Sequence, residues 1–126
     1  MAKAASTQTI TQGVSTITAA GAYNAPASGR GFEGWGSHRL AMWTLSAVTF
    51  AANGLIGFDP KADGKFPWAL AAVWGYYQPA GASDHLYVVA SFDPVNTNLQ
   101  CWDLTDNDAG ATDSPAGQFI IFAMSD

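Results

Sequence analysis

Few residues in this sequence are of the types that carry covalent chemistry. The chain has two histidines, His38 and His85, and one cysteine, Cys101. Nucleophilic catalysis needs a Ser or Cys, a His and usually a carboxylate brought together in the fold, and no Ser or Cys signature accompanies either histidine. Cys101 lies in an apolar stretch, which predicts a buried thiol that packs as a small hydrophobic group. We therefore expect no catalytic residues and no enzyme activity.

Acidic residues gather in one stretch, which is the best candidate for a metal site. Residues 103–110 include three Asp and one Asn, and Asp113 follows them. Clustered carboxylate and amide oxygens suit Ca²⁺, but neither the glycine nor the final glutamate of an EF-hand loop lines up from any starting Asp. We interpret residues 105–117 as a solvated acidic loop, and we predict neither a metal nor a cofactor.

The elements that must position these residues are predicted to be strands. From Phe32 onward, apolar runs alternate with clusters of Gly, Pro, Asn and Asp, a pattern typical of a β-sandwich or barrel. Gly and Asn tolerate positive φ and Pro lacks a donor for the sheet, so each cluster is typical of a turn. Two segments, residues 40–45 and 68–74, also allow a short helix. The expected strands are residues 39–51, 55–58, 68–77, 85–92, 99–104 and 118–124.

Residues 1–31 differ from the rest because Ala, Ser, Thr, Gly and Gln dominate them. Thr and Ile favour extended structure, so the segment is predicted to be an N-terminal arm that pairs with the domain or with a neighbouring subunit. The sequence thus divides into an arm, residues 1–31, and a β-sandwich domain, residues 32–126. The predicted fold class is all-β, a jelly-roll-like β-sandwich or barrel with an extended arm.

Composition and patterning both indicate a homo-oligomer. Hydrophobic residues make up 48% of the 126 residues and charged residues only 12%, about half the usual charged share of a soluble protein. Residues 86–89 and 119–122 are apolar at consecutive positions, which predicts strands that are covered on both faces.

The distributions of charge and of apolar residues exclude two classes of partner. The net charge is −5, and all five basic residues lie in the first 65 positions, so no basic face for nucleic acid can be assembled. No stretch has the length of a membrane span or the apolar core of a secretory signal. We expect a protein that is made in a cytoplasm and binds neither nucleic acid nor membrane.

The residues expected to bind a partner fall into two groups. The first belongs to a Gly-rich segment that lets the backbone approach another molecule closely, and the second consists of aromatic residues beside turns, expected near the surface. Trp43, in contrast, is predicted to lie in the core. The predicted partner-binding residues are Arg30, Phe32, Trp35 and His38 in the first group, and Trp68, Tyr76 and Tyr77 in the second.

In general character the chain resembles the small decoration or cement proteins that tailed bacteriophages place on their capsids. The resemblance rests on a signal-free, Ala/Ser/Thr-rich arm through about Gly31, followed by a short-stranded, low-charge β domain that ends at residues 119–126. It implies a jelly-roll or related β-sandwich and a homo-oligomer that docks onto a major capsid protein of an assembled shell. The absence of a basic lumenal face implies a position on the outside of the virion.

A second interpretation comes from the aromatic residues. Five Trp, with Tyr76 and Tyr77, are compatible with a carbohydrate-binding module or lectin-like β-sandwich whose rings stack on sugar faces, with Ca²⁺ at the acidic loop as a further possibility. Under this interpretation a glycan is the partner.

Overall fold

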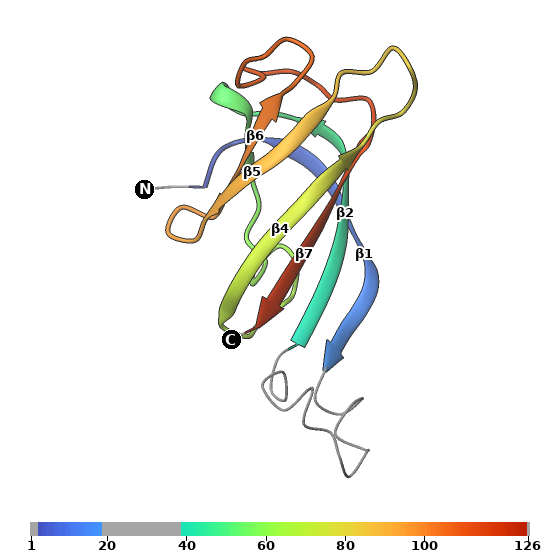
Figure 1. Cartoon of the computed structure of the whole chain (residues 1–126). Helices are drawn as coiled ribbons and strands as arrows, with labels where there is room; N and C mark the ends of the chain where they lie inside the picture. The colour runs from blue at the N-terminus through green and yellow to red at the C-terminus, as the bar shows by residue number, and fades with distance from the viewer. Residues whose placement is uncertain (1–2, 19–38, 126) are drawn as a thin grey trace.

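Two antiparallel β-sheets pack together in the computed structural model of the chain (Figure 1). The structure describes residues 3–18 and 39–125, and the side chains of residues 3–11 and 39–125. Within these residues the regular elements are strands and one turn of 3-10 helix, η2 (Ala52–Gly54), so the all-β β-sandwich prediction is confirmed. The same residues contain no helix with the length and apolar character needed to cross a membrane.

The larger sheet has four strands in the order β1-β2-β7-β4. The central strands β2 and β7 pair without irregularity, whereas β1 pairs with β2 through three register shifts. The bounds of the four strands are β1 (Thr7–Thr18), β2 (Arg39–Thr49), β7 (Gln118–Ser125) and β4 (Leu70–Gln78).

The smaller sheet has three strands in the order β3-β6-β5, namely β3 (Leu55–Gly57), β6 (Asn98–Asp103) and β5 (Tyr87–Asp93). The turn at η2 leads into β3 through Asn53 and Gly54, whose φ angles are 66° and 72°. A Cβ at Gly54 would lie 1.9 Å from the carbonyl oxygen of Ala109, so this position requires glycine for space as well as for φ.

The core lies between the two sheets and is filled by alternate residues of each strand. Trp43 and Cys101 are 1% and 0% exposed, so both are buried as predicted. The Trp43 indole Nε1 donates a hydrogen bond to the Gly64 carbonyl at 3.0 Å, and Phe58 and Phe66 contact the ring edge-on. This partner removes the penalty of burying the indole N–H.

The predicted strands are confirmed to within a few residues, and the helical alternatives are wrong. Residues 40–45 lie in β2, and residues 70–74 of the segment 68–74 open β4. Both strands gain hydrogen bonds from β7 on the side where they meet it. The high helix propensity of alanine is a weak preference, and pairing with neighbouring strands overrides it here.

Part of the predicted arm forms the edge strand β1. Thr7–Thr18 pair with β2, and Ile10 packs against the core. Before the strand, the Ala4 N–H donates to the Asn98 side-chain oxygen at 2.7 Å, and Lys3 forms an ion pair with Asp63. Residues 19–31 of the arm lie outside the described residues.

Two of the connections lie together at one end of the sandwich, at the top of Figure 1. They are the β4–β5 loop, residues 79–86, and the β6–β7 loop, residues 104–117. The start of β2, the start of β4 and the end of β7 lie at the opposite end. The fold therefore brings the β4–β5 and β6–β7 loops together at one end of the sandwich.

Candidate functional site

The outer face of strands β2, β7 and β4 carries mainly apolar side chains, of which Trp74 and Tyr76 are exposed. Residues that alternate with the buried ones along β2, β7 and β4 point outward, as the strand period of two dictates. We call this surface the aromatic face. Its side chains align across the strands in three rows, Leu40–Met124–Ala72, Met42–Phe122–Trp74 and Thr44–Ile120–Tyr76.

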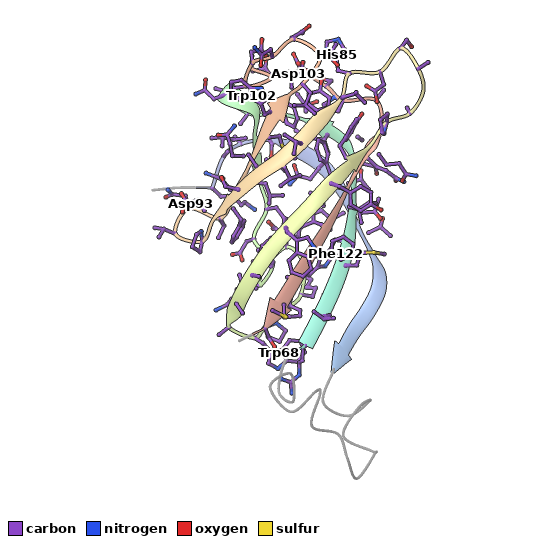
Figure 2. All side chains as sticks on the ribbon, in the orientation of Figure 1. Trp68, His85, Asp93, Trp102, Asp103 and Phe122 are labelled. Carbon is purple, nitrogen blue, oxygen red and sulfur yellow. The ribbon has the colours of Figure 1, made fainter. Side chains whose placement is uncertain are left out.

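Three near-parallel aromatic rings form the centre of the aromatic face. Phe122 and Trp74 are cross-strand partners whose ring centroids lie 5.5 Å apart with an interplanar angle of 16°. Tyr76 stacks on Phe122 at 6.3 Å and 27°. Trp74 and Tyr76 remain 45% and 52% exposed. Figure 2 shows Phe122 on this sheet, away from the loop end.

The aromatic face has no charge of its own. None of the nine residues in the three rows is an Asp, Glu, His, Lys or Arg. At the loop end of the sheet, Gln118 and Gln78 bond to each other through their side-chain amides at 3.0 Å. The face therefore offers apolar contact area and no ion-pairing group.

The loop end holds the densest group of titratable side chains among the described residues. His85, Asp103, Asp106 and Asp113 each offer one ligand atom, and these atoms lie within 4.8 Å of one another. Two of them, His85 and Asp113, border a hollow of about 440 Å³ that Asp84 and Tyr87 also line. Figure 2 shows His85 and Asp103 together at this end of the molecule.

We call His85, Asp103, Asp106 and Asp113 the acidic cluster. Asp103 is its most firmly held member because its side chain is fully buried. Its Oδ2 lies 2.9 Å from His85 Nδ1, and its Oδ1 accepts hydrogen bonds from the backbone N–H groups of Thr105 and Asp106 at 2.8 and 3.1 Å. Both carboxylate oxygens therefore have partners within the chain. A bound cation at these residues would compete with hydrogen bonds that already join β6 and the two loops.

The pKa values of the cluster follow from these contacts. The hydrogen bond to Asp103 raises the pKa of His85 above its usual value. Burial raises the pKa of Asp103, but the bonds from His85 and the backbone outweigh burial, and the pKa falls below its usual value. The pKa of Asp113 is raised, first by burial and then by the negative charges of Asp103 and Asp108.

A second hydrogen-bonded group ties the two loops to β4. The Tyr77 hydroxyl donates to Asp84 Oδ2 and accepts from the Gly117 N–H at 2.6 Å. Burial, together with the bond to Asp84, raises the pKa of Tyr77 far above its usual value. Tyr77 is thus a structural residue that joins the β4–β5 and β6–β7 loops.

No protein-family model, curated protein or solved structure matches this chain.

The predicted partner-binding residues divide into those that the structure describes and those that it does not. Arg30, Phe32, Trp35 and His38 lie outside the described residues.

Of the others, Tyr76 lies on the aromatic face as a surface residue, as expected. Trp68 is half-buried, with Phe66 against its ring and the Arg39 guanidinium 4.6 Å from its centroid. The expected surface position of Tyr77 is wrong, because this side chain points into the core and is only 8% exposed.

Sequence reasoning missed Trp74 and Phe122 as surface residues. Trp74 lies two positions before Tyr76, and in a strand both side chains point to the same face, so this spacing was a usable signal. Phe122 had no such signal, because residues 119–122 are apolar at every position. Asp103, Asp106 and Asp113 belonged to the acidic stretch that the sequence singled out, but His85 was missed as their neighbour, since it lies in a separate loop.

The cysteine has no exposed thiol. Cys101 is fully buried in the core, and burial raises the pKa of its thiol to about 12. At neutral pH the thiolate that a nucleophile or metal ligand requires is therefore negligible.

Proposed function

We propose that this protein is a non-enzymatic structural protein, a virion capsid decoration or cement protein that binds and stabilises an assembled capsid as a homo-oligomer. The observation that carries the proposal is the aromatic face, on which Trp74 and Tyr76 remain about half exposed in the single chain. Exposed aromatic surface of this kind marks a contact site more often than a solvated one.

The occupant of the aromatic face that fits best is a second copy of this chain. The three rows carry no charge, so two copies related by a two-fold axis meet without like-charge repulsion. Offset parallel rings present edges and partial faces that interdigitate with the same surface on a partner. Trp and Tyr are also the residue types that dominate binding energy at interfaces.

Attachment to a capsid is supported by the general character of the chain and by the order in which its strands pair. The nested pairing of β2 with β7 and of β3 with β6 is compatible with a jelly roll, the architecture that the resemblance to decoration proteins implies. The net charge of −5 favours the outer surface of a shell over a lumen filled with nucleic acid.

Carbohydrate binding is the alternative that the aromatic face also favours, because exposed Trp and Tyr on a β-sandwich can stack on sugar rings. Against it, Trp74 and Phe122 stack on each other and do not lie side by side in one flat platform. A glycan array with the intact protein separates the two functions, since a structural protein gives no signal that depends on Trp74.

Self-association is tested by analytical ultracentrifugation at micromolar concentration. The wild-type protein is expected to form an oligomer, and Trp74→Ser combined with Tyr76→Ser should weaken it at least about tenfold because two anchors are lost. Trp102→Ser, an exposed Trp on the other sheet, is the matched control and should leave the oligomer intact. A strictly monomeric wild-type protein contradicts the proposal.

Capsid attachment is tested by immunogold electron microscopy on particles released from cells that carry the gene. Antibody against this protein should label the outside of intact particles. Cells that carry the Trp74→Ser, Tyr76→Ser variant should release particles with less label. Absence of the wild-type protein from every purified particle would exclude the decoration role while leaving the self-association result unaffected.

A further inference from the structure

The outer face of the three-stranded sheet carries a second exposed apolar surface. β5 and β6 pair Val88 with Trp102, and the pairing continues past the strands because the Leu104 N–H donates to the Leu86 carbonyl at 2.7 Å. These four side chains, which we call the Trp102 patch, are between 39% (Trp102) and 55% (Leu104) exposed. The patch lies on the opposite sheet from the aromatic face, so one partner molecule cannot cover both.

Negative charge borders the Trp102 patch. Leu86 and Leu104 belong to the two loops that form the acidic cluster, and Leu86 is tied to the other loop because its N–H donates to the Thr105 hydroxyl at 2.9 Å. The β6–β7 loop adds Asp106 and Asp108, both with exposed side chains. Residues 66–126 contain no Lys or Arg that would neutralise these carboxylates.

We infer that the Trp102 patch is a docking surface for a different protein, one whose own apolar surface is bordered by Lys and Arg. An apolar centre with a charged border is the ordinary anatomy of a protein interface, and an exposed Trp is its commonest anchor. Two copies of this patch face to face would bring their acidic loops together, and like charges in an interface are strongly unfavourable.

The two apolar surfaces of the molecule therefore differ in the charge around them. The uncharged aromatic face accepts a second copy, whereas the Trp102 patch selects a basic partner and repels its own copy. A molecule with two such surfaces on opposite sheets can bind its own kind on one side and another protein on the other. The inference does not require the partner to be a capsid protein.

Two labelled synthetic peptides serve as probes of the Trp102 patch. Both are amphipathic and share one apolar Leu/Trp face, and they differ only in having Lys or Glu along its borders. Fluorescence anisotropy with the full-length protein should show at least tenfold tighter binding of the Lys peptide at low salt. Moderate salt should weaken that binding, since screening acts on exposed charges.

Variants locate the binding and test the role of charge. Trp102→Ser combined with Leu104→Ser should weaken binding of the Lys peptide at least tenfold, and Leu104→Ser alone provides a milder change in an exposed loop if the double variant folds poorly. Trp74→Ser with Tyr76→Ser is the matched control and should leave binding unchanged. Asp106→Lys combined with Asp108→Lys should reverse the preference toward the Glu peptide.

Three outcomes overturn the inference. They are equal affinity for the two peptides, no binding of either peptide, and binding that is lost in the aromatic-face variant but kept in the Trp102-patch variant. Each of these differs from failure of the proposed self-association, which is measured in the absence of peptide.

Discussion

The aromatic face and the acidic loop end differ in how far their side chains find partners within the chain. At the loop end, the titratable groups of Asp103, His85, Tyr77 and Asp84 have hydrogen-bond partners within the chain. On the aromatic face, Trp74 and Tyr76 keep about half of their surface in solvent, and both rings stack on Phe122. The difference indicates that the acidic cluster holds two loops together, and it supports the proposal that the aromatic face contacts another molecule.

The largest expected effect distinguishes a core tryptophan from a face tryptophan. Trp43→Ala should lower the free energy of unfolding by about 3 to 5 kcal/mol, because it leaves a cavity between Phe58 and Phe66. Trp74→Ala should lower it by about 1 kcal/mol or less, since only cross-strand contacts are lost. Guanidinium denaturation of both variants measures the difference. Equal losses would mean that Trp74 is part of the folding core.

The next effect concerns the buried carboxylate of the loop end. Asp103→Ala should lower the free energy of unfolding by about 3 kcal/mol, because it removes the acceptor of the Thr105 and Asp106 N–H groups. Asp106→Ala is the matched control, and it should cost less than about 0.5 kcal/mol because this side chain is exposed. Urea denaturation at constant pH provides the comparison. Similar costs for the two variants would show that Asp103 does not hold the loops.

A smaller effect is expected on the pH dependence of stability. The pKa of His85 is raised in the folded protein, so its contribution is complete below about pH 6.5 and is lost as the pH rises through the folded pKa. The pKa of Asp103 is lowered, so its contribution is present above about pH 3.9 and is lost as the pH falls through the folded pKa. The loop contact is therefore strongest in mild acid.

The variant His85→Gln tests this pH dependence. It should flatten the decline in stability above about pH 6.5 while leaving the acid limb, which depends on Asp103, in place. Urea midpoints measured across the pH range for both proteins show whether the alkaline limbs differ. Parallel profiles would exclude His85 as the group responsible.

The smallest expected effect is that of Ca²⁺ on thermal stability. Because Asp103 already has partners on both oxygens, millimolar Ca²⁺ should shift the unfolding midpoint by no more than about 1 °C, and no more than Mg²⁺ does. Differential scanning fluorimetry with and without chelator makes the comparison. A rise that is specific to Ca²⁺ and depends on Asp113 would favour the carbohydrate-binding alternative.

Local sequence determined which segments form strands and where most of these strands end. Gly, Pro, Asn and Asp end the apolar runs, and no tertiary information is needed to place a break at Asn53-Gly54, where both residues have positive φ. The burial of Trp43 and Cys101 also followed from sequence, since each lies inside an apolar run that a sandwich of this size must bury.

Tertiary structure decided which side of each strand faces the core and which loops meet. Tyr76 and Tyr77 are adjacent and chemically alike, so the sequence does not show which of the two side chains points to the core. Only pairing with β7 sends Tyr77 inward and Tyr76 outward. His85 and Asp103 are separated along the chain and become partners only because β5 and β6 pair with Tyr87 opposite Asp103. The rows of the aromatic face arise for the same reason, since register between strands distant in sequence aligns Met42, Phe122 and Trp74.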